Sequence, residues 1–156
     1  TEETGVETFS LPPDVKVEDS GAGDALFQEI CRTGIESSEP IALAIRPILA
    51  RGSRKEPKPM PLAAAKYELT LVMLEPIASS PGERVFDMTV TASGQRNGNL
   101  RKTDRVDIYR QAGGAKRVFA LAYPIELKAA GEIKVELMPV QGKALICGAV
   151  LNPVAN

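Results

Sequence analysis

The side chains that most often do chemistry in proteins are scarce in this chain, and histidine is missing from its 156 residues altogether. Without histidine there are no Ser–His or Cys–His nucleophile pairs, no histidine metal ligands and no imidazole for acid–base catalysis. The motifs GxSxG, HExxH and GxGxxG do not occur either. An enzyme built from this sequence would have to use carboxylates alone, and no two acids stand out at facing positions. We therefore predict a non-catalytic protein without a cofactor.

Two short groups of residues contain side chains of the kinds that bind ions. Asp104 and Asp107 carry the oxygens that calcium prefers. On a strand, however, residues i and i+3 fall on opposite faces, and calcium needs roughly six to eight oxygens. Gly113-Gly114, followed by Lys116 and Arg117, lacks the spacing of a phosphate-binding loop and reads better as a hairpin turn. We expect no metal site.

The two cysteines, Cys31 and Cys147, lie far apart in the sequence. They are either two buried small apolar residues or one disulfide that joins an early segment to the last strand. Spacing alone does not decide, because it cannot show that the sulfur atoms meet. The absence of a CxxC motif excludes a zinc ribbon and a thioredoxin-like redox site.

The length and net charge of the chain argue against several classes of protein. A chain of 156 residues is one ordinary domain, long enough to bury its own core. The net charge of −1 argues against a dedicated nucleic-acid binder, which usually has a basic excess. No apolar run approaches the ~18 residues of a membrane helix, so we expect no membrane span. The chain begins at Thr1, which is typical of a processed end or a fragment of a longer protein.

Three segments have a biased charge. Residues 1–29 carry eight acids and one base, and we expect a solvated arm with a short edge strand near its two prolines. Residues 51–61 contain four bases and three prolines, which predicts a stiff, extended insertion or a finger that binds acidic groups. Residues 96–117 carry seven bases and two acids. They form either a solvated hairpin or a surface for an acidic polysaccharide, a partner or the acidic arm.

Alternation of apolar and polar residues predicts the fold. Phe86, Met88 and Val90 share one face of a strand that begins after the turn signal Pro81-Gly82. Other strands recur every ~12 residues with turn chemistry between them, and no long segment has a helical period. This pattern favours an all-β protein, an antiparallel β-sandwich. The expected strands include 40–46, 66–76, 83–92, 104–110, 116–128, 132–140 and 143–151.

Arg84 stands where the strand after Pro81-Gly82 begins. Such an arginine can pair with a carboxylate or bind free carbonyl groups at the end of a strand. At the surface, an ion pair of this kind contributes only ~0–1 kcal/mol.

Several segments, in order, resemble malectin-like domains. They are "ALFQEICRTG" (25–34), "AKYELTLVMLEP" (65–76), "PGERVFDMTV" (81–90), "VDIYRQAGG" (106–114) and "GEIKVELMPVQGKALICGAVL" (131–151). The most specific pieces are "GERVFD" and "DIY..AGG". The resemblance implies a galactose-binding-like jelly roll over residues 24–151, with the acidic arm at 1–23 and a tail at 152–156. It also implies carbohydrate binding in a secreted, periplasmic or cell-envelope protein.

The resemblance also implies where sugar contacts would lie, on loops at one end of the sandwich. The positions of family aromatic residues fall on Thr33 and on Ile77 with Ala78, and a family aspartate falls near Val140 or Gln141. Among the rings of this chain, Tyr109 and Phe27 are the best candidates for stacking on a sugar. The predicted contacts are Phe27, Arg32, Thr33, Glu75, Ile77, Tyr109 and Gln141.

Two hypotheses follow for function. The first is a non-catalytic carbohydrate-binding module of a larger extracytoplasmic protein, whose partner is a glycan or polysaccharide. The second is a structural or protein-interaction sandwich that has lost the sugar site, because rings at the matched positions are replaced. It would bind other domains of a parent protein through 51–61 or an edge strand.

Overall fold

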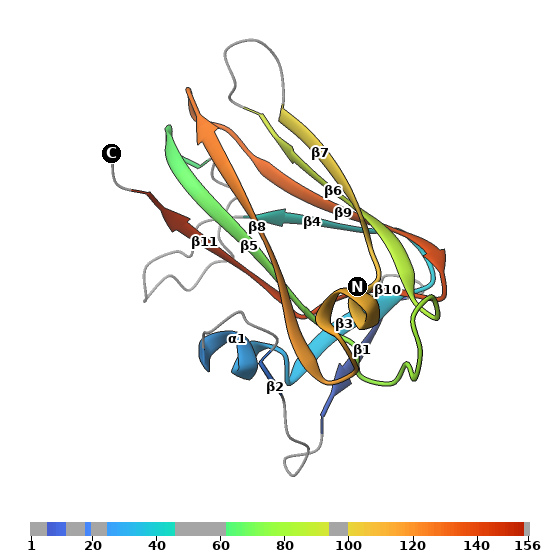
Figure 1. Ribbon diagram of the computed structural model, residues 1–156. Helices are drawn as coiled ribbons and strands as arrows, with labels where there is room; N and C mark the ends of the chain where they lie inside the picture. The colour runs from blue at the N-terminus through green and yellow to red at the C-terminus, as the bar shows by residue number, and fades with distance from the viewer. Residues whose placement is uncertain (1–5, 12–17, 20–24, 46–61, 94–99, 155–156) are drawn as a thin grey trace, which may run out of the picture.

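The computed structural model describes residues 6–11, 18–19, 25–45, 62–93 and 100–154. Two four-stranded sheets face each other, and a smaller three-stranded sheet lies at one end of the sandwich (Figure 1). Neighbouring strands are antiparallel, with one short parallel pairing. The predicted all-β antiparallel sandwich is therefore confirmed. The insertion predicted at 51–61 lies outside the described residues.

The first sheet has the order β11-β5-β8-β2. Its central strands are β5 (Ala65–Leu74) and β8 (Arg117–Leu127), which pair along ten residues of β5. β11 (Gly148–Pro153) flanks β5 on one side. On the other side of the sheet, β2 (Glu18–Asp19) of the acidic arm pairs in parallel with the start of β8, so that Glu18 lies opposite the basic Arg117.

The second sheet has the order β4-β9-β6-β7. Its strands are β4 (Ile41–Ile45), β9 (Ile133–Gln141), β6 (Val85–Ala92) and β7 (Leu100–Val106). In β6 every second residue from Phe86 to Ala92 is buried, as the alternation predicted. β4 and β7 are the two edges of this sheet among the described residues.

The third sheet contains β1 (Val6–Ser10), β3 (Thr33–Ser37) and β10 (Ala144–Ile146). β1 pairs only with β3 and is an edge strand, as expected for the stretch that precedes the two prolines. The acidic arm therefore contributes one strand to each of two sheets.

The core fills the space between the two large sheets. Its fully buried side chains come from alternate positions of facing strands, including Leu71 and Met73 of β5 and Phe86 and Met88 of β6. Burial of each such side chain contributes ~1.5–3 kcal/mol relative to exposure. The apolar residues at alternate positions of the sequence are therefore the ones whose burial stabilises the fold.

A second, smaller core lies on the outer face of β5. The helix α1 (Ala25–Ile30) brings Phe27 and Cys31 against Val72 and Leu74, together with Val118 of β8. β5 is consequently buried on both faces from Leu69 onward. Phe27 is thus part of this packing.

Two expected strands differ from the structure. The stretch 143–151 was expected as one strand, but it breaks at Cys147, since β10 pairs with β3 and β11 pairs with β5 in another sheet. β11 then continues to Pro153, two residues past the expected domain boundary. The stretch 104–110 was expected as a strand, but β7 ends at Val106 and the helix α2 (Ile108–Ala112) follows.

Local capping explains α2. The side chain of Asp107 accepts a hydrogen bond from the backbone N–H of Arg110, and Gly113 ends the helix with φ of 85°. The Gly113-Gly114 turn therefore closes a helix rather than a hairpin. The helix links the edge of one large sheet to β8 of the other.

The two large sheets are also joined by a hydrogen bond at their open edge. The hydroxyl of Tyr123 on β8 donates to Oδ2 of Asp104 on β7 at 2.6 Å. Burial, followed by this hydrogen bond and the charge of Asp104, raises the pKa of Tyr123 above its usual range.

The alternation in β9 gives a matched pair of core tests. Leu137 is fully buried and its neighbour Met138 is half exposed. We expect Leu137→Ala to lower the free energy of unfolding by about 2–5 kcal/mol, because it leaves a cavity between the sheets. The control Met138→Ala should change it by no more than about 0.5 kcal/mol. Urea unfolding measures both, and equal effects would contradict the assignment of faces.

The Tyr123–Asp104 bond predicts an alkaline instability. Above about pH 10 the unfolded tyrosine loses its proton while the folded tyrosine keeps it, so stability falls as pH rises. We expect Tyr123→Phe to reduce the slope of unfolding free energy against pH above that value, by up to ~1.4 kcal/mol per pH unit. Tyr109→Phe, which leaves the bond between the sheets intact, is the control. An unchanged slope in Tyr123→Phe would refute the raised pKa.

Candidate functional site

One end of the sandwich forms a hollow of about 250 Å³. It lies where the loop 75–84, between β5 and β6, meets the turn 142–143, between β9 and β10. This is the end at which the sequence placed most of its candidate contacts. The lining residues are Glu36, Glu75, Ile77, Ala78, Glu83, Arg84, Gly142 and Lys143.

Arg84 is the buried cation of this end, with 6% of its surface exposed. Its Nε donates to Oε1 of Glu75 at 2.6 Å, and its Nη2 donates to Oε2 of the same carboxylate at 3.4 Å. Nη1 donates to the carbonyl oxygen of Lys143 at 3.1 Å. From the sequence, Arg84 could pair with a carboxylate at the surface. The pair is instead buried, and the carboxylate is that of Glu75, which directly follows β5.

Glu36 of β3 adds a second carboxylate to the same guanidinium. Its Oε2 lies 3.0 Å from Nη1 of Arg84. Among the described residues this oxygen is also the buried side-chain atom without a hydrogen-bond partner. The contact is thus a charge contact without hydrogen-bond alignment, because Nη1 is aimed at Lys143. Glu36 therefore contributes to the charge network through this ion pair.

Glu75 is held by several hydrogen bonds within the protein. Besides Arg84, its Oε2 accepts the backbone N–H groups of Ile77 at 3.1 Å and Ala78 at 3.0 Å. Its carbonyl oxygen accepts the N–H of Lys116 at 2.8 Å. With no exposed surface, Glu75 organises the loop and has no free oxygen for a ligand.

The turn that precedes Arg84 is also held in place. Gly82 has φ of 87°, as the turn signal predicted, and its N–H donates to Oδ2 of Asp107 at 2.8 Å. Hydrogen bonds from Ser80 and Ser79 lower the pKa of Glu83 and keep its carboxylate ionised. This loop end is therefore anchored to α2 at one side and internally bonded at the other.

Gly142 brings the second segment into close contact with the first. It has φ of 72°, and a Cβ atom at this position would lie 2.7 Å from the carbonyl oxygen of Glu83. A side chain here would therefore separate the two segments that form the hollow.

Ile77 is the exposed apolar residue at the rim, with 76% of its surface accessible. Its backbone N–H is fixed by Glu75, so an apolar side chain is held outward at a defined position. Among the residues that the structure describes, no aromatic side chain lines the hollow. Sugar sites usually contain a ring on which the apolar face of the sugar stacks.

The structure brings only some of the predicted contacts together. Glu75 and Ile77 line the hollow, and Gln141 is exposed at the end of β9, next to Gly142. Tyr109 is half-buried on α2, which Asp107 ties to the same loop. The remaining contacts, Phe27, Arg32 and Thr33, come from α1 and the start of β3.

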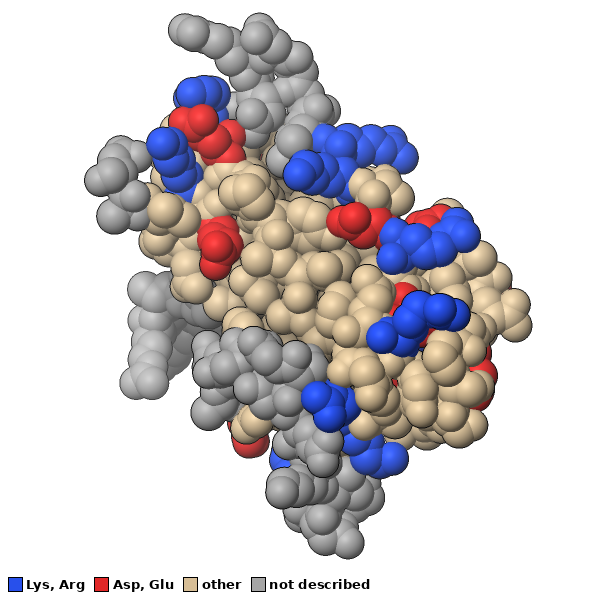
Figure 2. All heavy atoms as spheres, viewed as in Figure 1, with Lys and Arg blue, Asp and Glu red and all other residues tan. Residues whose placement is uncertain are grey.

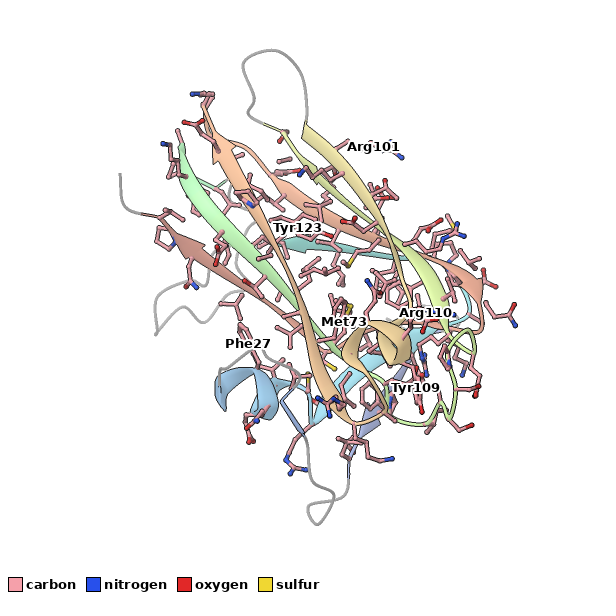
Figure 3. The ribbon with its side chains drawn as sticks, in the orientation of Figure 1. Phe27, Met73, Arg101, Tyr109, Arg110 and Tyr123 are labelled. Carbon is pink, nitrogen blue, oxygen red and sulfur yellow. The ribbon has the colours of Figure 1, made fainter. Side chains whose placement is uncertain are left out.

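Those three residues lie elsewhere. Figure 3 shows Phe27 beside α1, well apart from Tyr109. The carbonyl of Arg32 accepts the N–H of Leu11, and Thr33 lines a different groove with Phe9 of β1. The seven predicted contacts therefore do not form a single site.

Two bases of segment 96–117 pair with nearby acids. Arg105 pairs with Asp87 at 2.8 Å, which lowers the pKa of that carboxyl, and Arg110 lies 3.5 Å from Asp107. Figure 2 shows both signs of charge mixed around an uncharged centre on the face in view. This face has no single-sign field of the kind that attracts nucleic acid.

The sequence did not identify Glu36 and Lys143 as parts of this end. Glu36 lies in a segment for which the sequence predicted no element and is 48 positions from Arg84, and Lys143 was read only as the start of the strand 143–151. The one usable signal was the pairing of an acid at the end of one strand with an arginine at the start of the next.

Cys31 and Cys147 are free thiols that lie together, with Sγ of Cys147 4.0 Å from the carbonyl oxygen of Cys31. The described residues contain no group of three or more Cys, Asp or Glu side chains placed to hold a metal ion. Neither helix of the described chain is long and apolar enough to cross a membrane.

No family model matches the chain, and no curated protein matches it by sequence. Solved structures do match in fold. The plant receptor-like kinase ANX2 matches with a TM-score of 0.70 and 11% identity, over 96% of this chain and 38% of that one. A structure of the plant peptide RALF23 in complex with FER and LLG2 matches with a TM-score of 0.65 and 10% identity, over 92% and 38%.

A third match is an enzyme. Bacteroides uniformis beta-glucuronidase 2, covalently bound to cyclophellitol-6-carboxylate aziridine, has a TM-score of 0.56 and 12% identity, over 97% of this chain and 14% of the enzyme. This chain thus spans about two fifths of the receptor structures and a small part of the enzyme. The receptor matches include ectodomains of the malectin-like class. The chain therefore has the malectin-like fold that its sequence resembled.

The buried ion pair gives a direct test. Glu75→Gln keeps the side-chain size but leaves the Arg84 charge without its main carboxylate. We expect the free energy of unfolding to fall by about 3–5 kcal/mol. The control Asp87→Asn breaks the exposed pair with Arg105 and should cost less than about 1 kcal/mol. Chemical denaturation measures both, and a loss in Glu75→Gln as small as in the control would contradict the structural role of Glu75.

Proposed function

We propose that this chain is a non-catalytic module of a larger extracytoplasmic protein and that it binds a polypeptide partner through the loop end formed by residues 75–84 and 142–143. The observation that carries the proposal is the hollow at this end. It has an outward-held isoleucine at its rim and no aromatic ring in its lining. The class of function is that of the second hypothesis from the sequence, but the proposed surface is this loop end instead of 51–61 or an edge strand.

The lining argues against a sugar as the main ligand. Glu75 is fully buried and bonded to Arg84 and to the backbone of the loop, and Oε2 of Glu83 is engaged by Ser79 and Ser80. Polar groups that orient sugar hydroxyls must have free hydrogen-bonding capacity, and a pyranose also needs a ring to stack on. The position that would supply the ring is Ile77.

The same lining suits a peptide. Ile77 offers an apolar contact that a partner side chain can cover, and such anchors contribute strongly when they are desolvated. Glu36 Oε2 is buried and already lies 3.0 Å from Nη1 of Arg84, so it belongs to the charge network under the loop and not to the contact surface. A partner with an apolar side chain would cover Ile77 and remove it from water.

The fold supports placement in a larger extracytoplasmic protein. Malectin-like ectodomains of receptor kinases have this fold, and this chain corresponds to about 38% of the matched ANX2 chain. One matched structure is a complex of a peptide with two proteins. Loops at the end of a sandwich are where such folds usually place a binding site, because the sheets hold them rigidly.

Selection of peptides from a random phage-displayed library tests the proposal. We expect enriched peptides to bind the wild-type chain and to lose at least about tenfold in affinity to Ile77→Asp, since a charge replaces the apolar anchor. Isothermal titration measures the affinities. Met138→Asp is the control, because Met138 is also exposed but lies on the outer face of β9.

Two outcomes would contradict the proposal. One is a set of enriched peptides that bind Ile77→Asp as well as they bind the wild type. The other is binding of neutral or acidic oligosaccharides at millimolar concentration that Ile77→Asp or Tyr109→Ala abolishes. The second result would support the first hypothesis, which is carbohydrate recognition.

A further inference from the structure

The two cysteines of the chain are 116 positions apart in the sequence and lie next to each other beside α1. Cys31 directly follows α1, and Cys147 lies between β10 and β11. Cys31 packs with Val72 and Leu74 in the second core, and Cys147 packs against the same cluster. The sequence had left open whether these sulfur atoms meet.

Both cysteines are held by the same strand. The N–H of Cys147 donates to the carbonyl oxygen of Val72 at 2.9 Å, and the thiol of Cys31 donates to the carbonyl oxygen of Met73 at 3.4 Å. β5 therefore fixes the position of both residues. Neither depends on a loose loop for its placement.

The segments beside the two cysteines also pack tightly against each other. A Cβ atom on Gly148 would lie 2.6 Å from Cγ2 of Ile30. The residue after Cys147 thus touches the side chain of the residue before Cys31, with no room for a side chain of its own. With Sγ of Cys147 4.0 Å from the carbonyl oxygen of Cys31, this packing places the two cysteines side by side, as a disulfide requires.

The two thiols differ in accessibility. Cys31 has no exposed surface, whereas Cys147 is partly exposed and lines a groove of about 510 Å³. That groove also includes Phe9, Thr33 and Leu43. A small reagent can therefore reach Cys147 first, and Cys31 lies behind it.

We propose that Cys31 and Cys147 are a redox pair that closes to an intramolecular disulfide, with Cys147 as the entry thiol and Cys31 as the resolving thiol. The oxidant is a small-molecule disulfide such as oxidised glutathione. The bond ties α1 to the junction of β10 and β11.

The exchange proceeds in two balanced steps. The Cys147 thiolate attacks one sulfur of oxidised glutathione, which forms a mixed disulfide and releases one glutathione thiol. The Cys31 thiolate then attacks the Cys147 sulfur and releases the second glutathione. The protein loses two protons and two electrons, and the small disulfide is reduced to two thiols.

The reaction is slow while the protein stays folded. The neighbouring Cys31 thiol and burial both raise the pKa of Cys147, so little thiolate is present at neutral pH. Refolding in a glutathione redox buffer removes this kinetic barrier, because the thiols are exposed until the core forms.

The bond would act mainly on the unfolded chain. It closes a loop of more than a hundred residues, and the entropy removed from the unfolded state grows with loop length. Its occurrence in vivo rests on the extracytoplasmic placement proposed above, since disulfides persist in oxidising compartments. The chemistry itself is tested without any binding partner, so its failure is distinct from failure of the peptide selection.

The experiment refolds the chain with oxidised and reduced glutathione and maps its peptides by mass spectrometry without reduction. We expect the peptides with Cys31 and Cys147 to be linked, and the melting temperature to rise by roughly 5–15 °C over the reduced chain. Two free thiols after oxidative refolding, or a linked chain that melts no higher, would overturn the proposal.

Single variants test the assigned roles in the folded protein. Cys31→Ser lacks the resolving thiol, so Cys147 should accumulate as a mixed disulfide with glutathione. Cys147→Ser should leave Cys31 unmodified, because it is buried. In both variants the melting temperature should be independent of the redox buffer. Glutathione on Cys31 but not on Cys147 would reverse the roles and refute the proposal.

Discussion

A buried guanidinium is the constraint on which this end of the molecule depends. Arg84 is removed from water, and an unpaired charge there would cost several kcal/mol. Glu75, Glu36 and a carbonyl oxygen surround it and draw β3, β5, β6 and the turn after β9 toward one point. The loop between β5 and β6 is therefore rigid. The glutamate that looked like a ligand residue from the sequence is instead the residue that holds the loop.

The rigid loop determines what this end can recognise. Since Glu75 fixes the backbone of Ile77, an apolar side chain is presented outward at little further cost in conformational entropy. Turns at Gly82 and Gly142 allow the two segments to approach, and Asp107 connects them to α2. A pre-organised surface with an apolar anchor and no aromatic ring among its described lining residues supports the proposal of a polypeptide partner over a sugar ring.

Burial of both faces of β5 explains a second feature of the molecule, which is the proximity of its two cysteines. Because α1 covers the outer face of this strand, Val72 and Leu74 are as deeply buried as Leu71 and Met73. The cover brings the segment after α1 against the junction of β10 and β11. The break of the final apolar stretch into two strands leaves Cys147 at that junction, next to Cys31. The proposed recognition and the proposed covalent closure thus use separate parts of one sandwich.

The sequence by itself determined most of the strands, the two facing layers and the turn at Gly82, because alternation and turn chemistry are local properties of the chain. Phe86, Met88 and Val90 needed no partner to be recognised as core. The helix at 108–112 was missed, since five residues are too few to display a period.

Only the tertiary structure decided that Glu36, Glu75 and Arg84 share one charge network, that Phe27 packs on β5, and that Thr33 belongs to another groove. These contacts join residues from different strands and sheets. Their distances depend on strand order and register, which no local pattern contains.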